Sequence, residues 1–205
     1  IVISSRHQNE IYIIDHSTTT DEAASHDGGN SNKGGDLLYR WGNPSNYDRG
    51  TNSDAILKGQ HSVNWIEQGF PGEGNLILYN NQHSINSSAV LEIVTPLNPN
   101  NNYDLDNDEP YGPNTWEWIH QNNFFSDVQS GAFRLPNGNT LITVANEAYI
   151  FEVTTSGEEV WDYNYSSNNA MIARADRYGY DYFDNDLSGD VNGDELINVL
   201  DIILT

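Results

Sequence analysis

The sequence predicts an all-β fold built from repeated four-stranded antiparallel sheets. Three observations predict it. Twelve tyrosines, five tryptophans and six phenylalanines supply much of the apolar content, against a single methionine, and aromatic residues favour strands over helices. Short apolar stretches are separated by turn signals such as Asn-Gly. A unit of such stretches recurs three times along the chain, and repetition of this kind is typical of a β-propeller, in which each unit forms one blade.

The clearest copy of the unit spans residues 130–165. Turn signals at positions 137–138, 146–147 and 156–157 divide it into four stretches of alternating polarity. We therefore expect four strands in one antiparallel sheet.

The two earlier copies carry insertions. One begins at His61, has a Gly-Glu-Gly turn at 72–74 and contains an Asn- and Asp-rich insertion around residues 98–109. The first copy has only three strand-like stretches, and the chain opens on Ile1 without a methionine, so we expect its innermost strand to lie upstream. Three blades cannot close a ring, which predicts a partial propeller. A sandwich or a simple meander is the alternative.

Charge and cysteine content exclude several classes of function. Thirty acidic residues against eight basic ones give a net charge of −22, which repels nucleic acid and anionic membrane surfaces. The chain has no cysteine, so disulfides, zinc-thiolate sites and thiol nucleophiles are excluded. It has no apolar run long enough to form a transmembrane segment.

The strand pattern fades after about residue 168, and a different module follows. We expect a propeller part over residues 1–180, a linker over 181–188 and a calcium-binding segment over 189–205. Residues 190–201 place oxygen side chains at positions 1, 3, 5, 9 and 12 of a twelve-residue loop followed by a short helix. The predicted Ca²⁺ ligands are Asp190, Asn192, Asp194, Asn198 and Asp201, with the carbonyl of Leu196 at position 7. An Asn- and Asp-rich linker that binds nothing is the alternative.

Two positions of this loop depart from an EF-hand. Glu195 stands where glycine is usual at position 6, and Asp201 replaces the bidentate glutamate of position 12. With its GDVNGD and INVLD segments the loop resembles the first half of a type I dockerin. That resemblance implies calcium binding, a cohesin-like partner and an extracellular location. The second loop copy usual in that family is not found before Thr205, so we expect a truncated docking module.

The geometry of a propeller blade predicts which histidines lie on the same rim. The start of the innermost strand and the ends of the second and outermost strands share one rim, because neighbouring strands run in opposite directions. This rim is expected to hold His61, which opens an innermost strand, His7 at the end of a second strand, His83 just after another second strand, and Arg40 with Trp41. His16 and His26 fall elsewhere. Histidine can act as nucleophile or acid-base group, and the arginine fork suits a sulfate or carboxylate. Ordinary surface histidines and a three-histidine metal centre are the alternatives.

Five segments carry a resemblance to a known family. ISSRHQNEIYIID, GDLLYRWGNP, GQHSVNW, SGAFRLPNGNTLI and IFEVTTSGEEVWDY resemble the arylsulfotransferases, over roughly residues 1–180. The resemblance implies a six-bladed secreted, periplasmic or cell-surface bacterial enzyme that needs no nucleotide cofactor. It would move a sulfuryl group from a phenolic sulfate ester to a phenol through a sulfated histidine.

The resemblance also implies roles for three residues. His61 would be the nucleophile, while His7 and Arg40 would bind the sulfuryl oxygens and stabilise the developing negative charge. The family also uses a histidine on an upstream blade, which this chain does not contain. The competing hypotheses are a non-catalytic propeller that displays a ligand-binding face and a calcium-dependent scaffold module.

Overall fold

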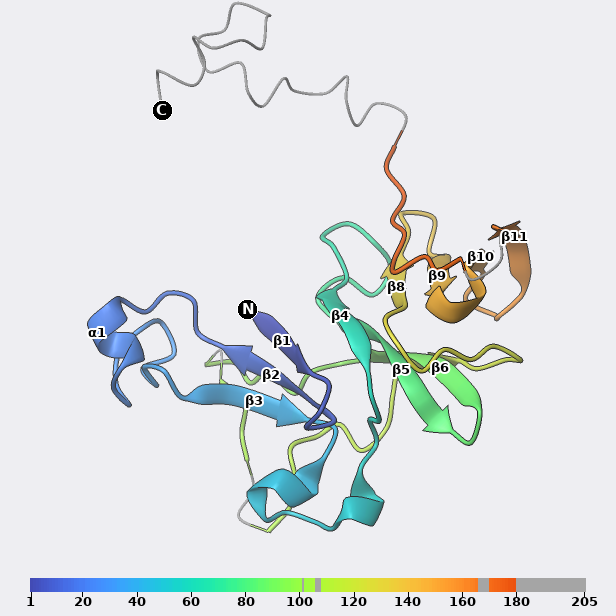
Figure 1. The fold of residues 1–205 in the computed structure, drawn as a ribbon. Helices are drawn as coiled ribbons and strands as arrows, with labels where there is room; N and C mark the ends of the chain where they lie inside the picture. The colour runs from blue at the N-terminus through green and yellow to red at the C-terminus, as the bar shows by residue number, and fades with distance from the viewer. Residues whose placement is uncertain (101, 106–107, 166–169, 180–205) are drawn as a thin grey trace, which may run out of the picture. The chain divides into compact units, whose positions relative to one another are not determined.

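The computed structural model describes residues 1–100, 102–105, 108–165 and 170–179. The chain divides into two compact units, residues 1–175 and 176–205, and the sheets all belong to the first (Figure 1). The predicted linker and the six predicted calcium ligands lie outside the described residues, so both stay predictions. Within the described part, no helix combines the length and the apolar character needed to cross a membrane.

The first sheet has three antiparallel strands in the order β1-β2-β3. They are β1 (Val2–Ser5), β2 (Glu10–Ile14) and β3 (Leu37–Trp41). The connection between β2 and β3 is the predicted insertion, which carries the short helix α1 (Thr20–Ala23), capped by reciprocal hydrogen bonds between Thr19 and Glu22.

The second sheet has four antiparallel strands in chain order. They are β4 (His61–Trp65), β5 (Leu76–Ser84), β6 (Ser87–Ile93) and β7 (Trp118–His120). Two short 3₁₀ helices, η1 (Pro44–Tyr47) and η2 (Asn52–Asp54), precede it. The predicted turn at 72–74 lies between β4 and β5, and the predicted insertion lies between β6 and β7.

The third sheet contains the four strands expected between residues 130 and 165. They are β8 (Gly131–Arg134), β9 (Thr140–Val144), β10 (Tyr149–Val153) and β11 (Glu159–Asn164), paired antiparallel in that order, with the 3₁₀ helix η3 (Ala145–Glu147) between β9 and β10. All three sequence turn signals lie at the strand connections, as predicted.

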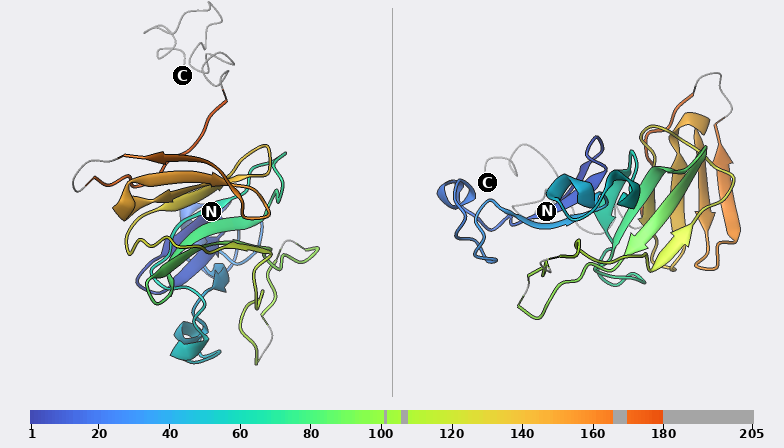
Figure 2. Two further views of the ribbon diagram at one scale, coloured as in Figure 1. Left: turned by 90° about the vertical axis from the view of Figure 1, so that its right-hand side faces the viewer. Right: turned by 90° about the horizontal axis from the view of Figure 1, so that it is seen from below.

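The second sheet buries both of its faces. Along β5, Leu76 and Leu78 pack into a core shared with the first sheet, whereas Ile77 and Tyr79 pack into a core shared with the third. Side chains of successive residues point to opposite faces of a strand. The Leu-Ile-Leu-Tyr run therefore contributes side chains to both cores, the one shared with the first sheet and the one shared with the third. Figure 2 shows the green strands of the second sheet stacked beside the orange strands of the third. Burial of both faces is the packing that a propeller blade requires.

A buried ion pair also joins the second and third sheets. Arg134 of β8 donates to the carboxylate of Glu92 in β6, and its guanidinium lies 5.1 Å from the centre of the Trp118 ring. Asn75 donates to the other carboxylate oxygen at 2.7 Å. The charge of Glu92 is therefore paired and hydrogen-bonded, as a buried charge must be.

The structure confirms the predicted all-β fold class. Three antiparallel sheets account for the chain's regular structure in the described residues, with hardly any helix. Their order and two-sided packing are compatible with consecutive blades of a partial propeller.

Candidate active site

His61 occupies the first position of β4, where the backbone is irregular. The pairing with β5 shifts register between His61 and Asn64, so β4 carries one extra residue there. Ser62 takes up this residue with a left-handed φ of 56°, a conformation that costs a non-glycine residue free energy. Such bulges redirect side chains and recur next to active sites. Because of the bulge, the side chain of His61 does not follow the regular alternation of side chains between the two faces of β4.

The imidazole of His61 is held by Asn81, a residue of β5 that is fully buried. Oδ1 of Asn81 lies 2.8 Å from Nδ1 of His61. The amide nitrogen of Asn81 donates to two carbonyl oxygens, those of Ser126 at 2.9 Å and Gln129 at 3.1 Å. These two bonds orient the amide, so Oδ1 must face His61 and accept a hydrogen bond from Nδ1–H. The lone pair of the neutral imidazole consequently lies on Nε2.

The loop that holds Asn81 is itself fixed. Ser126 donates its backbone N–H to Oγ of Ser88 at 3.1 Å, and Ser88 donates to the carbonyl of Asn81 at 2.7 Å. Gln129 and Ser130 both have left-handed backbones, with φ of 46° and 76°. Strained residues persist only where the surroundings determine them, so the support of His61 is preorganised.

His7 lies in the exposed turn between β1 and β2. This turn and the start of β4, where His61 stands, lie at the same end of the sheets (Figure 1). Two hydrogen bonds tie this turn to the segment that leads into β4. Gly59 donates to Oδ1 of Asn9 at 2.9 Å, and Gln60 donates to the carbonyl of Glu10 at 2.8 Å. The structure therefore brings the loops that carry His7 and His61 together.

Arg40 of β3 already has an anionic partner. Its Nε and Nη2 donate to the two carboxylate oxygens of Glu10 at 3.0 and 2.8 Å, and Glu10 is fully buried. The guanidinium also lies 4.6 Å from the centre of the Tyr47 ring. This bidentate pair satisfies a buried carboxylate. The role of Arg40 toward a sulfuryl group stays a prediction.

Three other histidines, His83, His16 and His26, have separate surroundings. The sequence placed His83 after its strand, but β5 continues through it, and burial lowers the pKa of the half-buried imidazole, which packs edge-on against Trp116. His16 follows β2, and His26 is exposed with Nδ1 2.7 Å from Oδ1 of Asp36. Among the described residues, no three His, Cys, Asp or Glu side chains gather so as to hold a metal ion. The three-histidine centre is therefore not assembled in that part of the chain.

Sequence reasoning missed a cation beside the bulge. Arg174 falls in the stretch assigned to a closing segment, yet Ser130 donates to the carbonyl of Ala173 at 3.0 Å, which holds that stretch against the start of β8. A Cβ built on Gly131 would lie 2.8 Å from Oγ of Ser62 and 3.1 Å from Cγ of Arg174. Only glycine leaves room for both side chains. The exposed guanidinium lies 5.7 Å from the centre of the Phe133 ring, and Arg174 forms no salt bridge within the described residues.

Sequence signals for the missed residues were weak. Asn81 belongs to an Asn-Asn pair that interrupts the apolar run of β5, a hint of a buried polar function at the strand end. Arg174 stands among the small and apolar residues 170–175, which differ from the acidic stretch after them.

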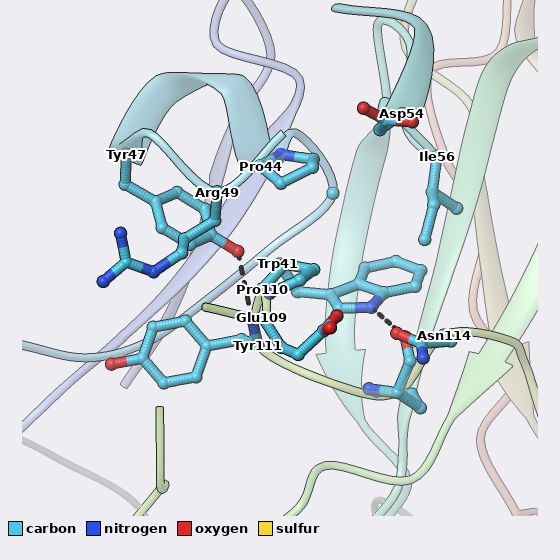
Figure 3. Close-up of a pocket in the computed structure, with 12 residues that line it drawn as sticks. Trp41, Pro44, Tyr47, Arg49, Asp54, Ile56, Glu109, Pro110, Tyr111 and Asn114 are labelled. Carbon is cyan, nitrogen blue, oxygen red and sulfur yellow. Dashed lines mark hydrogen bonds between the residues drawn. The ribbon is translucent and has the colours of Figure 1, made fainter. Parts of the chain in front are cut away.

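A separate pocket opens at the end of β3 (Figure 3). It has a volume of about 370 Å³ and lies among β3, η1, η2 and the loop around residues 109–114. Its apolar walls are three aromatic rings and three prolines: Trp41, Tyr47, Tyr111, Pro44, Pro110 and Pro113.

Comparison with known families identifies the family of the chain. The family model described as Arylsulfotransferase (ASST) matches residues 1–180, which is most of the 205-residue chain. No curated protein and no solved structure matches the chain. The match covers all three sheets, the bulge at His61 and the loop that supports Asn81. The chain belongs to the arylsulfotransferase family.

Proposed function

We propose that this protein transfers a sulfuryl group from a phenolic sulfate ester to a phenol acceptor through a sulfated His61. Family membership supports aryl sulfates and phenols as the substrate class. The observation that carries the mechanism is the bond between His61 and the buried amide of Asn81, because it leaves the lone pair of Nε2 available for attack. The transfer needs no nucleotide sulfate donor. The alternative is a non-catalytic propeller that presents a ligand-binding face.

The proposed reaction has two balanced displacements. Nε2 of His61 forms a bond to sulfur while the bond from sulfur to the aryl oxygen breaks, and the electron pair leaves with the phenolate, which takes a proton from solvent. The acceptor phenol then attacks the sulfur, its proton goes to solvent, and the electron pair of the S–N bond returns to Nε2. Covalent catalysis divides one difficult transfer into two easier steps.

Asn81 acts in both displacements as a positioning residue. Positive charge develops on the imidazole when Nε2 attacks, and a hydrogen bond from Nδ1–H to a fixed amide oxygen stabilises that charge. The amide cannot rotate without losing its two bonds to the Ser126 and Gln129 carbonyls. The support is thus present before substrate arrives, which is the condition for electrostatic preorganisation.

The sulfuryl group also needs a cation, because the chain carries a net charge of −22. Arg174 suits this role in our proposal, because its stem and Ser62, next in sequence to the nucleophile, both lie against Gly131. No carboxylate pairs with Arg174 in the described part of the chain. His7 is proposed to donate a further hydrogen bond to the sulfuryl oxygens, from the turn that contacts the His61 segment.

Removal of this cation gives a first test. Arg174→Gln is expected to lower kcat/KM for a nitrophenyl sulfate by roughly 10- to 100-fold, the scale of one hydrogen bond to a charged group. Lys33→Gln removes the same charge from the insertion between β2 and β3 and serves as the matched control. Steady-state kinetics measure both variants. Equal values for Arg174→Gln and the control would exclude Arg174 from the site.

The C-terminal loop supports a second, independent proposal. The oxygen spacing of residues 190–201 leads us to propose Ca²⁺ binding and attachment of a secreted protein to a cohesin-like partner. Isothermal titration should show calcium uptake that Asp190→Ala with Asp194→Ala removes. If the doubly substituted protein still shows a heat of calcium binding, the calcium binds at another site.

A further inference from the structure

The pocket at the end of β3 has fixed walls. Nε1 of Trp41 donates to the carbonyl of Pro113 at 2.8 Å, and the backbone N–H of Tyr111 donates to the hydroxyl of Tyr47 at 3.2 Å. The buried Tyr39 donates to the carbonyl of Gly112 at 2.6 Å and meets the ring of Tyr111 edge-on. These bonds tie the loop from the second sheet to the first. The pocket is therefore formed before any ligand binds, as small-molecule sites usually are.

The shape and chemistry of the walls favour a flat ring. Tyr47 and Tyr111 lie 6.0 Å apart between ring centres, beside the indole of Trp41 and three prolines (Figure 3). Aromatic and proline faces bind planar or flat apolar surfaces by stacking. A volume of about 370 Å³ lies within the range of sites that hold small organic molecules.

The polar groups of the pocket select for hydrogen-bond donors. Asp54 and Glu109 both line it, and no salt bridge within the described ranges neutralises either carboxylate. Two hydrogen bonds from Thr51, each 2.7 Å long, lower the pKa of Asp54 and keep it ionised. Arg49 also lines the pocket, but Figure 3 shows its guanidinium extending away from Trp41. Carboxylates accept hydrogen bonds from hydroxyl groups and repel anions.

From these features we propose that the pocket binds a neutral ring that carries hydroxyl groups, at a subsite separate from His61. A phenol and a sugar share this chemistry. The pocket wall includes Ile56, which belongs to the segment between η2 and β4, and the carbonyl of Ile56 accepts a hydrogen bond from Asn80 of β5. A ring held here would therefore lie on the segment that leads to the nucleophile. The subsite does not depend on the sulfuryl chemistry, since binding is measured without turnover.

Titration of the intact protein tests the subsite. In a His61→Ala, Arg174→Gln background, which removes both the proposed nucleophile and the proposed sulfuryl-binding cation, catechol, methyl glucoside and nitrophenyl sulfate are titrated separately by calorimetry. Saturable binding of catechol or of methyl glucoside is expected. The compound that binds more tightly shows whether the pocket prefers a phenol or a sugar. Nitrophenyl sulfate, an anion, should bind at least tenfold more weakly than the preferred neutral ring.

Two variants assign the binding to this pocket. Tyr111→Ala should weaken the affinity about tenfold through lost stacking, whereas Tyr163→Ala, which removes an exposed tyrosine of β11, should leave it unchanged. Glu109→Gln tests the exposed carboxylate without touching the packed rings, and a weakening of about threefold to tenfold is expected. The proposal is overturned if neither neutral ring binds, if the anion binds as tightly, or if both Tyr111→Ala and Glu109→Gln bind like the unmodified protein.

Discussion

His61→Ala is expected to lower the turnover of a nitrophenyl sulfate by roughly 10⁴-fold or more, the scale of loss on removing a catalytic nucleophile. In the proposed mechanism, Arg174 and His7 bind the sulfuryl oxygens, but neither replaces the lone pair that the bond to Asn81 leaves on Nε2. Release of nitrophenol with a phenol acceptor present measures the loss.

His83→Ala is the matched control. It removes a half-buried histidine from β5, the same strand that carries Asn81, and we expect turnover to stay within a few-fold of the unmodified protein. A His61→Ala protein that keeps its circular dichroism spectrum and its activity would refute the proposed mechanism.

Asn81→Leu is expected to lower kcat by roughly 10²- to 10⁴-fold, as loss of a residue that fixes a histidine tautomer does elsewhere. Leucine branches at the same carbon as asparagine but accepts no hydrogen bond, so Nδ1–H of His61 loses its partner. Two buried carbonyls, those of Ser126 and Gln129, lose their donor as well. This costs about 1 to 3 kcal/mol of unfolding free energy for each unpaired group, which urea denaturation measures.

Asn81→Asp loses the same two donors to the Ser126 and Gln129 carbonyls but restores an acceptor for Nδ1–H, so its difference from Asn81→Leu isolates that acceptor. The carboxylate still accepts from Nδ1–H, but its negative charge favours the imidazolium form of His61 over the neutral nucleophile. The neutral form then requires a higher pH, so the acidic limb of the kcat/KM profile should move to higher pH, and activity should recover partly there. An unshifted profile in Asn81→Asp would mean that Asn81 does not face the reacting imidazole.

The strand order of the third sheet followed directly from local turn chemistry. Asn137-Gly138 and the signals at 146–147 and 156–157 occupy the connections between its strands because such turns need few distant contacts. His83 shows the limit of that reasoning. Its position within β5 is set by the tight hairpin to β6, where Asn86 takes a left-handed backbone.

The site was less predictable than the fold. The histidine at the start of β4 could be picked out, but its partner Asn81 lies twenty positions away, and the orientation of the amide depends on carbonyls 45 and 48 positions further along. Arg174 could not be assigned to the site without knowing that residues 173 and 130 are hydrogen-bonded. Contacts at these separations depend on how sheets pack, which local patterns do not specify. The buried partner of Arg40 was missed for the same reason, since Glu10 is thirty positions away.

The most direct test of the account is to trap the intermediate. The intact protein is mixed with excess nitrophenyl sulfate and no acceptor, quenched at alkaline pH to preserve the S–N bond, and digested for mass spectrometry. We expect one sulfuryl group per active protein, on the imidazole of His61, and its loss on addition of a phenol. A sulfuryl group on another residue, or turnover with no modified residue at all, would contradict the central claim that His61 is the nucleophile.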